Sequence, residues 1–118
     1  MREAVYHIGR NKNSNEIYVF NETVSSSHAQ IIIDENGDLI IIDLSSKNGI
    51  LVNGKKIISP VKLIKGDVIT IGDFNCMQSD LVNSIKVFDF KNQQPTERSV
   101  PLKSSLQKEK IKPKNKIK

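Results

Sequence analysis

Short apolar runs, each bounded by glycine, asparagine, aspartate or serine, recur through the first 90 residues of the chain. The runs are rich in isoleucine, valine and aromatic residues, which is the usual composition of β-strands. Five of them cover residues 4–8, 17–20, 29–33, 39–44 and 68–71. Turn residues separate the runs throughout, and no segment up to Phe90 keeps an apolar period of 3.6 residues. The pattern predicts an all-β domain.

Two Asn-Gly pairs lie between apolar runs and indicate hairpins. Asn36 and Gly37 follow the third run, and Asn53 and Gly54 lie between residues 50–52 and the isoleucines that come next. Asn-Gly is the preferred sequence of tight turns in which both central residues need a positive φ. We therefore expect antiparallel strand pairs at both places.

The distribution of apolar residues also predicts the arrangement of the strands. Consecutive isoleucines at 31–33 and 40–42 indicate strands that are covered on both faces, in the middle of a packed pair of sheets. Residues 82–90 alternate between apolar and polar side chains and predict a last strand. We therefore expect a β-sandwich of two packed, mainly antiparallel sheets.

The net charge of +5 is unevenly distributed along the 118 residues. Residues 91–118 contain nine basic and two acidic residues, whereas residues 1–90 contain nine basic and eleven acidic residues. The same C-terminal stretch has three prolines and few large apolar side chains, so it cannot offset the entropy of ordering. We expect one folded domain over residues 1–90 and a basic, disordered tail over residues 91–118.

Several classes of protein are disfavoured by what the sequence lacks. No apolar run approaches the roughly 20 residues that span a bilayer, and the N-terminus shows no secretory pattern. We expect a cytoplasmic protein with no membrane partner. Cys76 is the single cysteine, and His7 and His28 are the two histidines, so we expect neither a disulfide nor a metal or other cofactor.

Five short motifs occur in a fixed order across residues 6–72. They are Gly9-Arg10, Ser25-x-x-His28, Ser46-x-Asn48-Gly49, Asn53-Gly54 and Leu63-x-x-Gly66-Asp67-x-Ile69-x-x-Gly72. This order resembles the forkhead-associated (FHA) domain. The resemblance implies a β-sandwich that binds threonine-phosphorylated proteins, the products of Ser/Thr kinases, through loops at one end.

A phosphothreonine carries a charge of about −1.5 to −2 and three strong acceptor oxygens. By the resemblance, Arg10 offers a planar fork of N–H donors, and Ser25 offers its hydroxyl and, as a further donor, its backbone N–H. Asn48 has both a donor and an acceptor for the main chain of an extended peptide. Ser26 and Lys47 occupy flanking positions, for which a ligand contact and no contact both remain open.

The resemblance assigns supporting roles to five further residues. The ring of His28 holds the loops together by hydrogen bonds and takes no part in catalysis. Gly9 and Gly49 supply backbone freedom around the site. Asn53 and Gly54 form a hairpin that supports the site and makes no ligand contact.

Two positions depart from the family pattern. Ile50 stands where relatives usually have a threonine, and only eight residues precede Gly9 where relatives usually have further strands. An absent edge strand would expose unpaired backbone groups. We hypothesise that residues 84–90 pair with this edge, or that a second chain does, which leaves the oligomeric state open.

The sequence also permits other functions. A hydrolase could combine Ser25, His28 and Asp43, but no glycine pattern of a nucleophile elbow surrounds the serine, so we expect no enzyme. The basic tail could contact nucleic acid or an acidic partner weakly through charge. The same fold could also dock partners independently of phosphate. Finally, Thr96 is alone in the tail and could be a regulatory phosphosite bound in cis.

Overall fold

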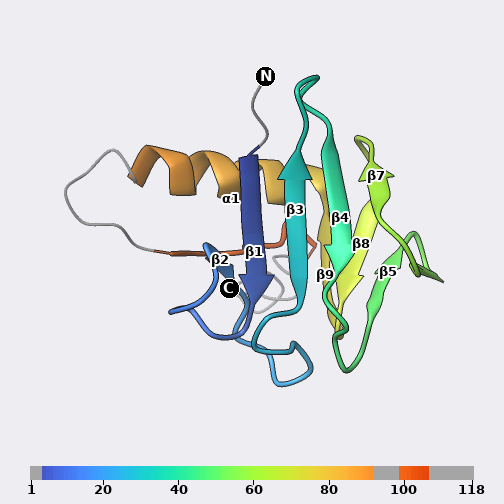
Figure 1. Cartoon of the computed structure of the whole chain (residues 1–118). Coiled ribbons are helices and arrows are strands. Elements are labelled where there is room, and N and C mark those ends of the chain that lie inside the picture. Colours follow the sequence, from blue (N-terminus) through green and yellow to red (C-terminus); the bar gives the residue numbers. More distant parts are fainter. Residues whose placement is uncertain (1–3, 92–98, 107–118) are drawn as a thin grey trace, which may run out of the picture.

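The computed structural model describes residues 4–91 and 99–106, which form two packed β-sheets and one helix (Figure 1). The elements are β1 (Ala4–Gly9), β2 (Ile17–Tyr18), β3 (Ala29–Ile33), β4 (Leu39–Asp43), β5 (Ile50–Val52), β6 (Lys55–Lys56), β7 (Val61–Leu63), β8 (Val68–Ile71), β9 (Phe74–Met77), α1 (Gln78–Lys91) and β10 (Val100–Pro101). The predicted β-sandwich fold is confirmed.

The two sheets differ in size. The first sheet has the strand order β10-β2-β1-β3-β4-β7, and the second has the order β6-β5-β8-β9. All pairs are antiparallel except β1 with β2 and β2 with β10. In this part of the chain, no helix is long and apolar enough to cross a bilayer.

Antiparallel strand pairs form at both predicted hairpins, but only the Asn53-Gly54 turn has two successive positive φ values, because Asn36 is not among the residues with a positive φ. Gly37, between β3 and β4, has a φ of 86°, and Asn53 and Gly54, between β5 and β6, have φ values of 53° and 84°. Two successive positive φ values are those of a type I′ turn, which matches the twist of the flanking strands. The local sequence therefore determines where these strand pairs form.

The core lies between the sheets and α1. The first sheet contributes Tyr6, Ile8, Ile17, Ala29, Ile31, Leu39, Ile41, Leu63 and Val100, and the second contributes Ile50, Ile69, Ile71 and Cys76. Complete burial of one isoleucine contributes roughly 1.5–3 kcal/mol. The alternation of buried and partly exposed positions along β1, β3 and β4 fixes which face of each strand is turned inward.

The expectation that the isoleucine runs are covered on both faces is wrong for these residues. Ile32 and Ile40 pair across β3 and β4, Val5 pairs with Ile32, and none of the three is part of the core. Val5 is 43% exposed. In three consecutive isoleucines, the middle side chain must point away from the other two, because side chains alternate along a strand.

The predicted strand over residues 82–90 is also wrong, because this segment belongs to α1. The buried positions Leu81, Ser84 and Ile85, with the partly buried Phe88 one turn later, form a helical stripe. The backbone N–H of Met77 donates to the carboxylate of Asp80 at 2.9 Å, which is one half of a capping box. Packing and capping together favour a helix over the alternating strand.

The helix covers the part of the first sheet that the second sheet leaves open. It packs on β2, β9 and β10, and lies behind β1 and β3 in the view of Figure 1. The Tyr6 hydroxyl donates to Asp89 at 2.8 Å, and the rings of Tyr6 and Phe88 meet edge to face at 6.0 Å. Burial, with the Asp89 carboxylate beside it, raises the pKa of Tyr6 to about 12.

The hypothesis that residues 84–90 complete the sheet edge beside β1 is therefore wrong. The edge is filled from within the chain, because β2 pairs in parallel with β1 and β10 pairs in parallel with β2.

The expected disorder from Lys91 onward needs correction for residues 99–106. Val100 and Leu102 are 1% and 5% exposed, and Leu102 donates its backbone N–H to Tyr18 at 2.9 Å. The Ser104 hydroxyl donates to the Asn75 carbonyl, and Ser105 donates to Asp80. The edge of β2 is free to pair with another strand, and residues 100–101 pair with it. The composition of this proline-containing segment does not reveal that pairing. Thr96 and the rest of the tail lie outside the described residues.

Candidate functional site

Three loops meet at one end of the sandwich: residues 10–16 after β1, residues 21–27 before β3 and residues 45–49 after β4. The strand register brings them together, because Ile8 pairs with Ala29 and Ala29 pairs with Asp43. The loops follow one another along the lower edge of the molecule in Figure 1. We call them the first, second and third site loops.

The first and second site loops are joined mainly through the backbone. Arg10 donates its backbone N–H to the Ser25 carbonyl at 3.0 Å. A Cβ on Gly9 would lie only 2.7 Å from Asn15 Nδ2 and would also collide with the Ser26 carbonyl. Gly9 is therefore required because it has no side chain, which allows the two loops to approach closely. It does not have a positive φ, so the expected need for backbone freedom does not apply to it.

Asn15 is a supporting residue that the sequence did not reveal. Its side chain is 4% exposed, and Nδ2 donates to the Asn11 carbonyl and to the Ser26 carbonyl, each at 2.7 Å. Because both partners are carbonyl oxygens, only the amide nitrogen can serve them. The one signal in the sequence was an asparagine within a polar loop, and such residues are usually exposed.

His28 joins the second and third site loops and is fully buried. Its Nδ1 accepts the backbone N–H of Ser25 at 2.9 Å, and its Nε2 lies 2.9 Å from the Gly49 carbonyl. Since Nδ1 accepts a hydrogen bond, the proton is on Nε2, which donates to Gly49. These are the two hydrogen bonds that a bracing role for His28 requires.

The bond to His28 also changes the expected role of Ser25. Its backbone N–H is occupied by the imidazole, so the expectation of this N–H as a second ligand donor is wrong. The Ser25 hydroxyl oxygen accepts the backbone N–H of Lys47 at 3.1 Å. A hydroxyl that accepts one hydrogen bond still has its proton to donate to a ligand.

The third site loop is held by its own side chains. Ser46 donates its N–H to the Asp43 carboxylate at 3.0 Å, and the Ser46 hydroxyl accepts the N–H of Gly49 at 2.9 Å. Gly49 has a φ of 79°, a backbone conformation that favours glycine. Lys47 and Asn48 are exposed on this loop.

Asn48 connects the third site loop back to the second. Its Nδ2 donates to the Thr23 carbonyl at 2.7 Å. Thr23 in turn accepts the N–H of Asp73 on its hydroxyl at 2.8 Å, and its own N–H donates to Asn21 at 2.8 Å. One amide donor of Asn48 is thus used for positioning, and its oxygen and remaining N–H are available for a ligand.

The predicted site residues therefore gather at this end of the fold. Arg10, Ser26, Lys47 and Asn48 are exposed, and Ser25 is partly buried between them. Arg10 and Lys47 contribute two positive charges on the first and third loops, and neutral donors lie between them. Such an arrangement suits a small anion attached to an extended chain.

Asn53 and Gly54 lie elsewhere. In the pairing of β5 with β8, Ile50 lies opposite Ile71 and Val52 lies opposite Ile69, so the Asn53-Gly54 turn leaves β5 at the end away from Gly49. Asn53 donates to the Asp67 carboxylate and accepts the N–H of Val68, each at 2.9 Å. The pair braces the turn before β8, and the expectation that it supports the site loops is wrong.

The alternative of a catalytic Ser-His-Asp group does not match this geometry. His28 uses both ring nitrogens on main-chain groups, and the Asp43 carboxylate accepts the Ser46 N–H. A general base would instead need its nitrogen within hydrogen-bond reach of the serine hydroxyl.

Solved structures that are similar to this chain include FHA domains. The FHA domain of the CT664 protein from Chlamydia trachomatis is 32% identical, with a TM-score of 0.59 over 61% of this chain and 72% of that chain. The FhaA FHA domain in complex with the intracellular domain of Rv3910 is 31% identical, with a TM-score of 0.57 over 64% of this chain and 79% of that one. An FHA domain from a study of phosphothreonine-dependent interactions is 31% identical, with a TM-score of 0.56 over 64% and 75% of the two chains.

A search of curated protein sequences gave no significant match. The family model of the FHA domain matches residues 6–72, which is more than half of the chain and runs from within β1 to just past the end of β8. All three site loops lie within this segment. Together with the sandwich and the loops that His28 braces, this match shows that the chain belongs to the FHA domain family.

Proposed function

We propose that this protein is a phosphothreonine-dependent interaction module that binds phosphorylated partner peptides through the three site loops. The observation that carries the proposal is the hydrogen-bonded frame around His28, which fixes the loops while leaving Arg10, the Ser25 hydroxyl and Asn48 accessible. A preformed site lowers the ordering cost of binding. The phosphothreonine-dependent interactions of a similar FHA domain support the same assignment.

Each group has a distinct part in this proposal. Arg10 pairs with two phosphate oxygens through its planar fork, and Ser25 donates its hydroxyl proton to the phosphate. Asn48 bonds the peptide main chain. Lys47 adds charge at the rim, where screening limits its contribution. Ser26 has the least defined part of the five residues. Its carbonyl already accepts a hydrogen bond from Asn15, and its side chain is exposed.

The expected affinity is micromolar. A few hydrogen bonds to a charged phosphate contribute about 1.5–3 kcal/mol each, and the loss of translational and rotational freedom opposes them. Such binding suits a reversible contact in signalling. The place of that contact in the cytoplasm and the kinase that prepares the partner remain predictions.

Fluorescence anisotropy with a degenerate phosphothreonine peptide library, beside phosphoserine and unphosphorylated libraries, tests the proposal. We expect binding that needs the phosphate and falls at least about 30-fold in Arg10→Ala, because removal of one partner of a charge pair costs roughly 2–5 kcal/mol. Lys65→Ala is the matched control, because this exposed cation lies between β7 and β8, outside the site loops. Equal affinity for phosphorylated and unphosphorylated peptides would instead show a phosphate-independent docking module.

A further inference from the structure

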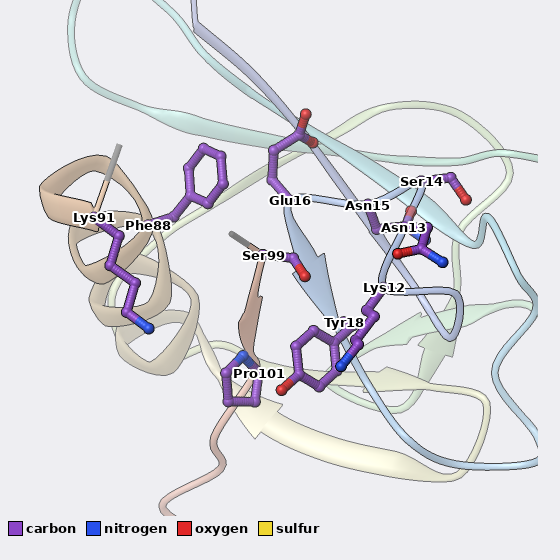
Figure 2. Close-up of a pocket in the computed structure, with 10 residues that line it drawn as sticks. All are labelled: Lys12, Asn13, Ser14, Asn15, Glu16, Tyr18, Phe88, Lys91, Ser99 and Pro101. Carbon is purple, nitrogen blue, oxygen red and sulfur yellow. The ribbon is translucent and has the colours of Figure 1, made fainter. Parts of the chain in front are cut away.

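A cleft of about 780 Å³ begins two residues beyond Arg10. Its walls are the tip of the first site loop, the outer side of β2, the C-terminal end of α1 and the start of the β10 segment (Figure 2). Both α1 and β10 lie outside residues 6–72, the segment that matches the family. Of the described residues that line the cleft, six belong to the segment that matches the family and four lie beyond it.

Two lysines give the cleft its charge. Lys12 reaches it from the first site loop, and its Nζ lies 5.9 Å from the centre of the Tyr18 ring, on which it is held by a cation–π contact. Lys91 enters from the end of α1, on the other side of Ser99 and Pro101 in Figure 2. A ligand lying between them would meet a positive charge on each side.

Among the described residues that line the cleft, Glu16 is the acidic one, and its carboxylate is already hydrogen-bonded. Its carboxylate accepts the backbone N–H of His7 at 2.6 Å and lies 3.0 Å from the His7 ring nitrogen Nδ1. In Figure 2 this carboxylate points away from the amino groups of Lys12 and Lys91. Asn13, Ser14 and Ser99 add neutral donors to the lining, so the described part of the cleft favours an anion.

The loop wall of the cleft is preorganised. Ser14 donates its N–H to the Asn11 carbonyl at 3.2 Å, Asn13 donates its N–H to the Asn11 side chain at 2.9 Å, and buried Asn15 ties the loop to Ser26. Arg10 and Lys12 thus lie on one loop, whose backbone is held by these hydrogen bonds and by that of the Arg10 N–H to Ser25. A ligand bound by one residue is held close to the other.

We propose that this cleft binds acidic side chains of the same peptide whose phosphothreonine occupies the site loops, an inference that rests on the proposed function. Two residues span at most about 7 Å of backbone, which is about two residues of an extended peptide at about 3.3 Å per residue. The side chain of Lys12 extends beyond its backbone, so the cleft lies more than two peptide residues from the phosphate site. The loops lie in a row with the first site loop at one end, so one flank of the peptide leaves the phosphate site beside the cleft. Acidic residues three to five positions from the phosphothreonine on that flank reach Lys12 and Lys91.

The test uses three phosphothreonine peptides with alanine flanks: one neutral, one with three aspartates at positions three to five before the phosphothreonine, and one with them after it. We expect one acidic peptide to bind roughly three- to tenfold more tightly than the neutral one. The double variant Lys12→Ala, Lys91→Ala removes this gain and changes neutral-peptide binding less than twofold. The double variant Lys65→Ala, Lys86→Ala loses the same charge on exposed lysines that do not line the cleft, and keeps the gain.

Backbone amide shifts in NMR separate the failure of this inference from the failure of the proposed function. Shifts at Ser25 and Lys47 with the neutral peptide report the phosphate site, and additional shifts at Asn13, Ser14 and Ser99 with the acidic peptide report the cleft. The cleft inference is wrong, and the proposed function stands, in either of two cases. In the first, binding depends on the phosphate but the acidic peptides bind no more tightly than the neutral one. In the second, an acidic peptide binds more tightly and keeps this advantage in the Lys12→Ala, Lys91→Ala variant. If no phosphopeptide shifts Ser25, the function fails, and the cleft inference fails with it. If a single-stranded oligonucleotide shifts Asn13, Ser14 and Ser99 more than the acidic peptide does, the cleft binds nucleic acid and the peptide inference is wrong.

Discussion

Replacement of His28 by alanine is the most direct perturbation of the frame that holds the site loops. The ring is fully buried and bonds two main-chain groups, the Ser25 N–H and the Gly49 carbonyl. His28→Ala leaves both without this partner, and each such group costs about 1–3 kcal/mol when it stays buried. The lost ring also leaves a cavity, which adds to this cost.

The magnitude of the effect follows from the surroundings. Ser25 is only partly buried, and the Gly49 carbonyl retains a weaker contact with the Gly72 N–H at 3.4 Å. We therefore take the lower half of the range for each group and expect a total loss of about 3–5 kcal/mol in the free energy of unfolding. That is a large part of the total stability of a small domain, which is about 5–15 kcal/mol.

Urea unfolding followed by far-ultraviolet circular dichroism measures this loss, and His7→Ala is the matched control. His7 is about 39% exposed in its side chain and pairs with Glu16, so its removal should cost less than about 1 kcal/mol. In the intact protein, nitrogen NMR of the His28 ring should show the Nε2–H tautomer. A His28→Ala protein as stable as His7→Ala, with unchanged phosphopeptide affinity, would refute the bracing role.

Four further predictions test other parts of the structure. Gly9→Ala should destabilise the fold by more than about 2 kcal/mol in urea unfolding, because its Cβ would collide with the second site loop; a neutral effect contradicts the close approach. Val100→Ala should cost about 2 kcal/mol in the same assay, whereas an unfolded tail would show no change. Burial raises the pKa of Cys76 from 9.0 to about 12, so native protein should react slowly with thiol reagents at pH 8, and fast labelling would contradict this burial. The same shift stabilises the fold fully below pH 9, and this contribution, roughly 4 kcal/mol at most, is lost as the pH rises from 9 to 12; a Cys76→Ala protein should lose less stability between pH 9 and 10.

The strands and turns were largely predictable because their signals are local. Runs of β-branched residues favour extended backbone wherever they occur, and Asn53 with Gly54 accepts the positive φ values of a tight turn without help from distant residues. The order of the motifs around Arg10, Ser25 and Asn48 also located the candidate site, because short loops between paired strands have little freedom in where they lie.

The hydrogen bonds that connect the site loops to one another were not predictable in the same way. Asn15 is an ordinary loop asparagine in the sequence, and only the approach of the second site loop makes it a buried link to Ser26. Similarly, the sequence shows that Ser25 has a backbone N–H but not that His28 occupies it. These contacts depend on the distance between separate segments, which no local pattern encodes.

Residues 78–106 show most clearly where the sequence by itself was insufficient. The segment around Ile85 shows an alternating pattern in the sequence, yet it forms a helix, because a helix could bury Leu81 and Ile85 against the open part of the first sheet beside Tyr6. Val100 lies in a stretch whose composition indicates disorder, and the unpaired edge of β2 made it a strand. The sequence alone thus determined the sandwich and the position of its loops, through local backbone preferences. The tertiary structure alone decided what closes the sheet edge and completes the cleft beside Lys12, because the free energy of those contacts depends on surfaces that exist only after folding.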